Sequence, residues 1–151
     1  MKHLLLILSL FLLEGCSIPS KKKMYQEISN YTLPKSPKKN EAVIFIVRPS
    51  IRGIFRRAHI YINKPITESN VGWTRGRQYL YLAVAPGTHK IYSKIDNLNS
   101  ISINAKKGDI IFLKQQISIG FMKTTNTLVQ IGETEGKYLI KNTSIGTFAS
   151  Q

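Results

Sequence analysis

Arginine is the residue type in this chain with the clearest chemical meaning. Its planar guanidinium group binds phosphate or carboxylate through paired hydrogen bonds and stacks on aromatic rings. All six arginines fall between residues 48 and 77, whereas lysine is used before and after this segment. We expect two loops, residues 50–57 and 69–78, to carry five of these arginines with two aromatic residues between them. The candidate binding residues are Arg52, Arg56, Arg57, Trp73, Arg75 and Arg77.

A basic and partly aromatic face of this kind suits an anionic glycan, a lipid headgroup or an acidic protein. The net charge points the same way, because 22 Lys and Arg against 8 Asp and Glu give +14. A charge of this size indicates an anionic partner or a solubilising surface. Two solvated loops with one aromatic ring packed into the core remain the alternative.

Residues for catalysis or metal binding are sparse. No acidic residues are spaced as a general acid and base or as metal ligands, and no Gly-x-Ser-x-Gly elbow occurs. We read Asp109 as a turn residue and place Glu133 and Glu135 in a loop. His59 and His89 lie on separate predicted strands without a nearby cysteine, so a zinc site lacks ligands. We therefore predict a protein that is not an enzyme, with no metal and no cofactor.

The first residues have the architecture of an export signal. A basic start at Lys2 and His3 precedes the apolar run of residues 4–13, and Gly15 stands directly before Cys16. A helix that spans a bilayer needs about 20 apolar residues, so this run is too short for a permanent anchor. We expect residues 1–15 to be a signal peptide.

The sequence Leu13-Glu14-Gly15-Cys16 resembles the lipobox of bacterial lipoproteins, although Glu14 stands where a small or apolar residue is usual. The resemblance implies that Cys16 receives a diacylglycerol and becomes the new N-terminus. Because Ser17 rather than aspartate follows it, the resemblance further implies the periplasmic face of the outer membrane. Loss of residues 1–15 removes Lys2 and Glu14 and leaves the charge at +14. Export also argues against a nucleic-acid partner.

Residues 16–41 have the composition of a linker. They contain three prolines and six lysines, with few apolar residues. We expect a lipidated N-terminus followed by a flexible basic tether, with at most a helical turn or two in residues 24–31. Its lysines either approach anionic headgroups or belong to a solvated spacer.

Short strand patterns dominate the remaining chain. Residues 42–47 form a continuous apolar run typical of a buried strand, and residues 58–63 alternate between apolar and polar. Further strands are predicted at residues 79–84, 88–95, 100–105, 109–117 and 127–131, and residues 136–142 suit a short helix or an edge strand. We predict one domain, residues 42–151, that is an all-β sandwich or small open barrel of about seven strands.

The stretch from residue 79 to 92 carries the strongest turn signal. Pro86 suits the first corner of a tight turn and Gly87 can adopt a positive φ. We expect the two flanking strands to form a hairpin, and we expect the ring of His89 to donate to a backbone carbonyl at this corner.

With these residues in place, the chain resembles a family of uncharacterised bacterial lipoproteins that carry a domain of unknown function. The shared pattern consists of Arg48-Pro49, Asn63, Val71-Gly72, Tyr79, the corner Pro86-Gly87-Thr88-His89, and Gly108-Asp109 with Phe112. The resemblance covers about residues 42–135 and implies a periplasmic β-sandwich module without known catalysis.

These expectations combine into one functional hypothesis. The chain is expected to be a membrane-anchored lipoprotein and a non-enzymatic binding module for an anionic envelope component or an acidic protein. A structural subunit of an envelope assembly that docks through a strand edge is the alternative. A hydrolase is a more distant one.

Overall fold

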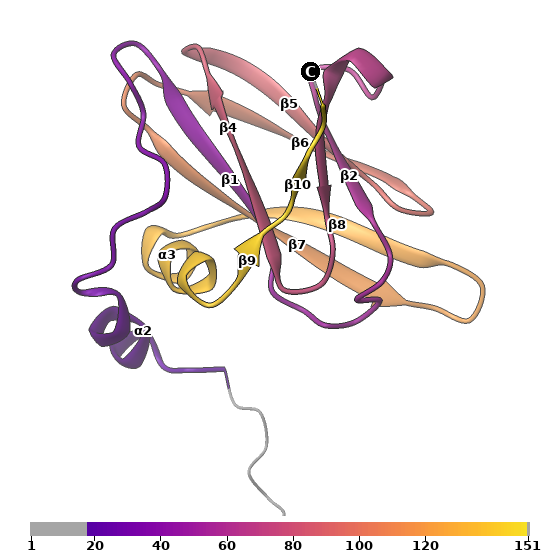
Figure 1. Cartoon of the computed structure of the whole chain (residues 1–151), viewed down its shortest axis with the longest axis horizontal. Coiled ribbons are helices and arrows are strands. Elements are labelled where there is room, and N and C mark those ends of the chain that lie inside the picture. The colour runs from indigo at the N-terminus through magenta and orange to yellow at the C-terminus, as the bar shows by residue number, and fades with distance from the viewer. Residues whose placement is uncertain (1–17, 151) are drawn as a thin grey trace, which may run out of the picture.

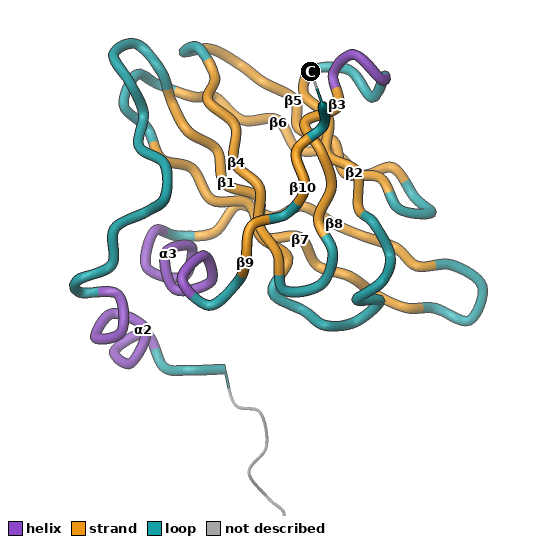
Figure 2. Tube along the Cα trace, viewed as in Figure 1, coloured by secondary structure: helices purple, strands orange, loops and turns teal. Residues whose placement is uncertain are grey.

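The computed structural model describes residues 18–150, so Cys16 and the predicted signal peptide lie outside the described residues. The described chain is mostly strands, arranged in two sheets of which neither closes into a barrel (Figures 1 and 2). The all-β sandwich is therefore as predicted, but this part of the chain contains ten strands rather than about seven. The strands are β1 (Ala42–Arg48), β2 (Ala58–Ile62), β3 (Asn70–Thr74), β4 (Gln78–Val84), β5 (Gly87–Lys94), β6 (Leu98–Ala105), β7 (Ile110–Ile119), β8 (Thr124–Ile131), β9 (Ser144–Ile145) and β10 (Thr147–Phe148). Helices α2 (Lys21–Ile28) and α3 (Glu133–Lys141) and a 3-10 helix (Thr67–Ser69) complete it.

The two sheets have five strands each. The first has the order β8-β7-β1-β4-β9 and the second the order β10-β3-β2-β5-β6. The expectation that residues 69–78 form a loop is wrong, because Asn70–Thr74 is strand β3. Strands β9 and β10 are only two residues long, and so short a segment carries no alternation that a sequence pattern can reveal.

Strand β1 is buried on both faces, which explains its unbroken apolar sequence. Ile44 and Ile46 pack into the core between the two sheets. Val43 and Phe45 point to the other face, where they form a second core with Ile140 of α3. The second sheet, the first sheet and α3 therefore form three successive layers, with β1 at the centre.

The predicted hairpin at residues 79–92 is wrong. Strand β4 pairs with β1 in the first sheet, whereas β5 pairs with β2 and β6 in the second. Gly87 does adopt a positive φ of 142° at the corner, and the Nε2 of His89 donates to the carbonyl of Ala85 over 2.8 Å, as expected. The corner carries the chain from one sheet to the other. In that arrangement Leu80 and Ile91 bury their side chains in one shared core.

The segment before β1 packs more closely than its linker composition suggests. Helix α2 begins at Lys21, with Ser20 as its N-cap, and packs against α3. Its residues Met24 and Ile28 are buried, as is Leu33 beyond it. Buried Met24, Ile28 and Leu33 thus pack this segment against the rest of the domain, although its composition is rich in lysine and proline. No helix within residues 18–150 is long and apolar enough to cross a bilayer.

Residues 136–142 are mostly helical, so α3 settles the choice left open by the sequence. Glu133 and Glu135 lie in its first turn, not in a loop, where carboxylates suit the helix dipole. Glu133 pairs with Lys137 and Glu135 with Lys114, each over 2.6 Å. Asp109 accepts the backbone N–H of Lys106, so it is the turn residue that was predicted.

The two sides of the sandwich are closed in different ways. On one side the outward N–H groups of β8 donate to side chains that follow β5. Thr124 donates to Asp96, Asn126 to Asn97 and Leu128 to Asn99, over 2.8, 2.7 and 2.9 Å. On the other side the chain passes directly from β9 in the first sheet to β10 in the second.

Strand β10 approaches β3 closely at Gly72. This glycine has φ +143°, and a Cβ atom there would overlap the backbone of Thr147 and Phe148. Only glycine therefore fits at this position. The close approach places Phe148 beside β4, where its ring meets Tyr81 edge to face at 5.1 Å.

Candidate functional site

Trp73 lies on the outer face of the second sheet and stands opposite His59 in the pairing of β2 with β3. The two ring centres are 5.8 Å apart, and the guanidinium carbon of Arg57 lies 5.1 Å from the centre of the indole. A cation over an indole ring is the most favourable cation–π arrangement. Arg57 and Trp73, both predicted as binding residues, therefore do come together.

The same face extends across β2 to β5. His59 is paired with Lys94 in the sheet, and its ring lies 6.4 Å from that of Tyr61. Tyr61 in turn stands opposite Tyr92. Because alternate residues of a strand share a face, these side chains form a continuous strip of rings and cations. We call Arg57, His59, Tyr61, Trp73 and Lys94 the arginine–tryptophan face.

A shallow hollow of about 390 Å³ opens on this face. Three cations, Arg56, Arg57 and Lys94, line it against one carboxylate, that of Asp96, so its lining carries +2 with His59 neutral. Arg56 forms an ion pair with Asp96. The side chains of Arg57 and Lys94 make no hydrogen bond or ion pair within residues 18–150, so their charged groups are available to an anionic ligand.

No protein-family model matches the chain, and no curated protein matches it. The chemistry of the site therefore rests on its own residues. Within the described residues, no cluster of three His, Cys, Asp or Glu side chains is arranged to hold a metal ion.

His59 responds electrostatically to this environment. Burial lowers its pKa below the ordinary 6.5, and the charges of Arg57 and Lys94 lower it further. The buried Nδ1 of His59 has no hydrogen-bond partner among residues 18–150. An anion bound beside Arg57 and Lys94 would cancel part of their effect and favour the protonated ring.

Arg48 supports the loop that carries the arginines. Its side chain is 0% exposed, and its guanidinium group donates to the carbonyls of Arg52, Gly53 and Arg56 over 2.9, 2.6 and 2.8 Å. No carboxylate of residues 18–150 forms an ion pair with it, and burial lowers its pKa. Arg48 is thus a structural residue: it holds the backbone of residues 52–56 in place and adds a buried positive charge next to this loop.

The remaining predicted residues lie near this face but do not join it. Arg52, Arg75 and Arg77 are exposed, and their guanidinium groups make no hydrogen bond within the described chain. The two arginine-bearing segments do touch, because the N–H of Gly76 donates to the carbonyl of Ile54 over 3.3 Å. The structure therefore unites Arg56, Arg57 and Trp73 and leaves the other three on adjoining turns.

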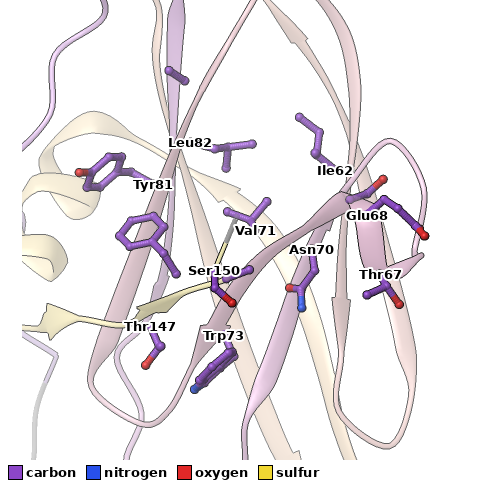
Figure 3. Close-up of a pocket in the computed structure, with 14 residues that line it drawn as sticks. Ile62, Thr67, Glu68, Asn70, Val71, Trp73, Tyr81, Leu82, Thr147 and Ser150 are labelled. Carbon is purple, nitrogen blue, oxygen red and sulfur yellow. The ribbon is translucent and has the colours of Figure 1, made fainter.

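A larger groove of about 1210 Å³ lies on the other side of Trp73, between β4 of one sheet and β3 and β10 of the other (Figure 3). Its lining is mainly apolar and aromatic, with Tyr81, Leu82 and Val71 among the side chains in the close-up. Glu68 and Asn70 add polar groups at its rim. Trp73 lines this groove and also contacts Arg57 and His59, which line the cationic hollow.

His59, Tyr61 and Lys94 were missed as binding residues. The alternation in residues 58–63 does place His59 and Tyr61 together, on the face opposite Ile60. Their proximity to Lys94 and Trp73 depends on which strands pair and in what register, and no local pattern carries that information.

Proposed function

We propose that this protein is a lipid-anchored, non-enzymatic binding module that holds an anionic component of the cell envelope, or an acidic protein partner, on the arginine–tryptophan face. The observation that supports this most is the guanidinium group of Arg57 over Trp73, with Lys94 and His59 beside it. The membrane location, the periplasmic side of the outer membrane, follows from the lipobox-like residues before Cys16.

The arrangement suits ligands that combine a ring or flat surface with negative charge. Trp73 and Tyr61 present aromatic surface. The guanidinium carbon of Arg57 lies 5.1 Å from the centre of the Trp73 indole, and Lys94 adds a second positive charge on the same face. Because the hollow is open to solvent, its attraction for anions weakens with salt. The groove beyond Trp73 offers additional contact area for an extended ligand.

Docking through a strand edge, the alternative, finds less support at β8. The three outward N–H groups of Thr124, Asn126 and Leu128 already donate to side chains of the same molecule. An incoming strand would first have to displace Asp96, Asn97 and Asn99. The resemblance to uncharacterised lipoproteins fits either role and stays a prediction.

The proposal is tested with polygalacturonate as a carboxylated polysaccharide and polyglutamate as an acidic polypeptide. We expect Arg57→Gln and Trp73→Ala each to weaken binding of one of these probes about fivefold, since exposed cation–π and charge contacts contribute about 1 kcal/mol. The substitution Lys107→Gln, at the exposed turn before β7, removes one positive charge as Arg57→Gln does and serves as the charge-matched control. Equal loss in the control, or unchanged binding after joint neutralisation of Arg52, Arg56, Arg57, Arg75 and Arg77, would contradict the placement of the site.

Lipid anchoring has a separate test. Replacing Cys16 with alanine is expected to release the protein from the membrane fraction or to leave it unprocessed at higher mass. Unaltered fractionation together with unaltered mass would refute lipidation at Cys16 and would leave the binding test unaffected.

A further inference from the structure

Three large apolar side chains project into solvent from two neighbouring loops. Phe55, in the loop between β1 and β2, is 88% exposed. In the turn between β7 and β8, Phe121 is fully exposed and Met122 is 87% exposed. We call Phe55, Phe121 and Met122 the tip residues. Isolated exposed apolar residues are ordinary, but adjacent exposed side chains of this size mark an interaction surface.

The two loops are held together by one carboxylate. Asp96 pairs with Arg56, next to Phe55, and its other oxygen accepts the N–H of Thr124, near the start of β8. The turn between β7 and β8 is also closed by a hydrogen bond from Gly120 to Lys123 over 2.9 Å. The tip residues therefore belong to one supported region of the fold.

Cations accompany the tip residues. Arg52 precedes Phe55 in the same loop and Lys123 follows Met122, and both cations are exposed. Apolar side chains beside lysine and arginine are the combination that binds the headgroup region of an anionic bilayer. An acidic protein surface would match the cations but not the tip residues.

The beginning of the fold lies on the same side. Helix α2, the loop between β1 and β2, and the turn of the β7–β8 hairpin all lie along the lower edge of the molecule in Figure 1, with α2 at its left end and the β7–β8 turn at its right end. Helix α2 begins at Lys21, five residues after Cys16, and five residues span at most about 17 Å. A lipid on Cys16 would therefore hold this side of the fold against the bilayer. Three further exposed cations, Lys21, Lys22 and Lys23, stand at the start of α2.

We propose that the tip residues insert into the headgroup region of an anionic bilayer and orient the domain on the membrane. This goes beyond the proposed function, because the tip residues lie outside the arginine–tryptophan face. With the lower side against the bilayer, that face is left at the side of the domain. The insertion does not require the lipid anchor and is measurable without it.

The test uses residues 17–151, because both hydrophobic cores lie between Leu33 and Ile140 and α2 is retained. The probes are vesicles of phosphatidylglycerol with phosphatidylethanolamine, and vesicles of phosphatidylcholine as the neutral reference. We expect Phe121→Ser with Met122→Ser to weaken sedimentation with the anionic vesicles roughly tenfold or more, because burial of either side chain is favourable by more than 1 kcal/mol. Both residues are exposed, so the urea midpoint should not change.

The matched control is Ile66→Ser with Ile110→Ser, which removes two apolar side chains that are 46% and 37% exposed. Ile66 precedes the 3-10 helix, which Figure 2 shows at the upper side of the molecule. We expect this control to bind vesicles like the unaltered chain. If the control lost as much vesicle binding as the tip variant, exposed apolar residues anywhere on the surface would contribute equally to vesicle binding, and the proposal would be overturned.

Insertion is located directly by fluorescence. Trp73 is the only tryptophan in the chain, so Phe121→Trp adds a reporter at the tip, and Trp73→Phe in the same chain isolates it. We expect brominated lipids to quench the tryptophan at position 121 and to leave native Trp73 unquenched. The proposal would be overturned if only Trp73 were quenched, or if the variant with Phe121→Ser and Met122→Ser bound vesicles as well as the unaltered chain. It would also be overturned if the tip residues were found to form a dimer of the protein in the absence of lipid. None of these results bears on polygalacturonate binding, so the two proposals fail independently.

Discussion

Arg48→Met is expected to destabilise the protein and to release the loop between β1 and β2. Methionine preserves the apolar stem but removes three strong hydrogen bonds to the carbonyls of Arg52, Gly53 and Arg56. At about 1 kcal/mol net for each bond, the loss is about 3 kcal/mol. The fourth bond, to the carbonyl of Thr74 at 3.4 Å, is long and adds little.

A favourable effect of the substitution offsets part of this loss. Replacing a buried charge with an apolar side chain also removes a desolvation cost, and such replacements are at times neutral. Here, however, the partners are backbone carbonyls that cannot be replaced along with Arg48. They lose their donors, and only the carbonyls nearest the surface can turn to water. The net effect is therefore destabilising.

Urea unfolding followed by the fluorescence of Trp73 measures the effect. With a dependence on urea of about 1 to 3 kcal/mol per molar, a loss of 3 kcal/mol lowers the midpoint by about 1 to 3 M. Trypsin provides a local measurement, because the released loop offers Arg52, Arg56 and Arg57 for cleavage.

Arg48→Lys is the control that separates charge from geometry. It retains the charge, but one ammonium group cannot reach carbonyls on both sides of the loop as the guanidinium fork does. We expect a loss close to that of Arg48→Met. An unchanged urea midpoint and unchanged trypsin sensitivity in Arg48→Met would refute the role assigned to this residue.

Two further predictions follow from His59 and Gly136. The pKa of His59 is lowered in the folded protein, so the unfolded chain binds a proton before the folded protein does as the pH falls below about 6.5. The stability that neutral His59 contributes is therefore present above that pH and declines until the pH has fallen through the pKa of the folded state. We expect His59→Gln to flatten the decrease in the urea midpoint between about pH 7.5 and pH 5. An equally steep decrease in the variant would show that other groups are responsible. A Cβ atom at Gly136 of α3 would overlap the ring of Phe112, so Gly136→Ala should destabilise by about 1 to 3 kcal/mol despite the better helix propensity of alanine. Gly132→Ala, where no described atom lies within 4 Å of the new Cβ, is the control in thermal unfolding and should cost less than Gly136→Ala, because only the preference of the α3 N-cap for glycine over alanine is lost.

Local sequence patterns predicted those elements whose burial follows from their own residues. Strands β1 and β2 could be predicted without knowing which strands pair with them. A strand buried on both faces has an unbroken apolar sequence, as β1 does, and a strand buried on one face alternates between apolar and polar residues, as β2 does. The turn at Asp109 and the hydrogen bond of His89 are likewise local and could be predicted. Strand β3 could not, since Gly72 and the polar residues around it resemble a loop.

The error at residues 79–92 has a different origin. A turn signal between two strands shows that the chain reverses, but it does not show whether the strands then meet edge to edge or face to face. That choice depends on β1 and β2, which take the pairing edges of β4 and β5. The same distinction applies to the candidate site. The arginine-rich composition predicted Arg57 and Trp73 as binding residues, whereas Lys94 lies beside them only because of the register in which β5 pairs with β2, which the sequence does not reveal.

The different closures of the two sides of the sandwich have a mechanical consequence. Along β8, hydrogen bonds from Thr124, Asn126 and Leu128 tie the sheets together at alternate residues. On the opposite side, β9 and β10 contribute only two residues each. Local opening requires the least free energy where the fewest hydrogen bonds must break. Local opening of the sandwich is therefore expected to begin at β9 and β10, beside the groove that Trp73 lines, while the β8 side stays closed.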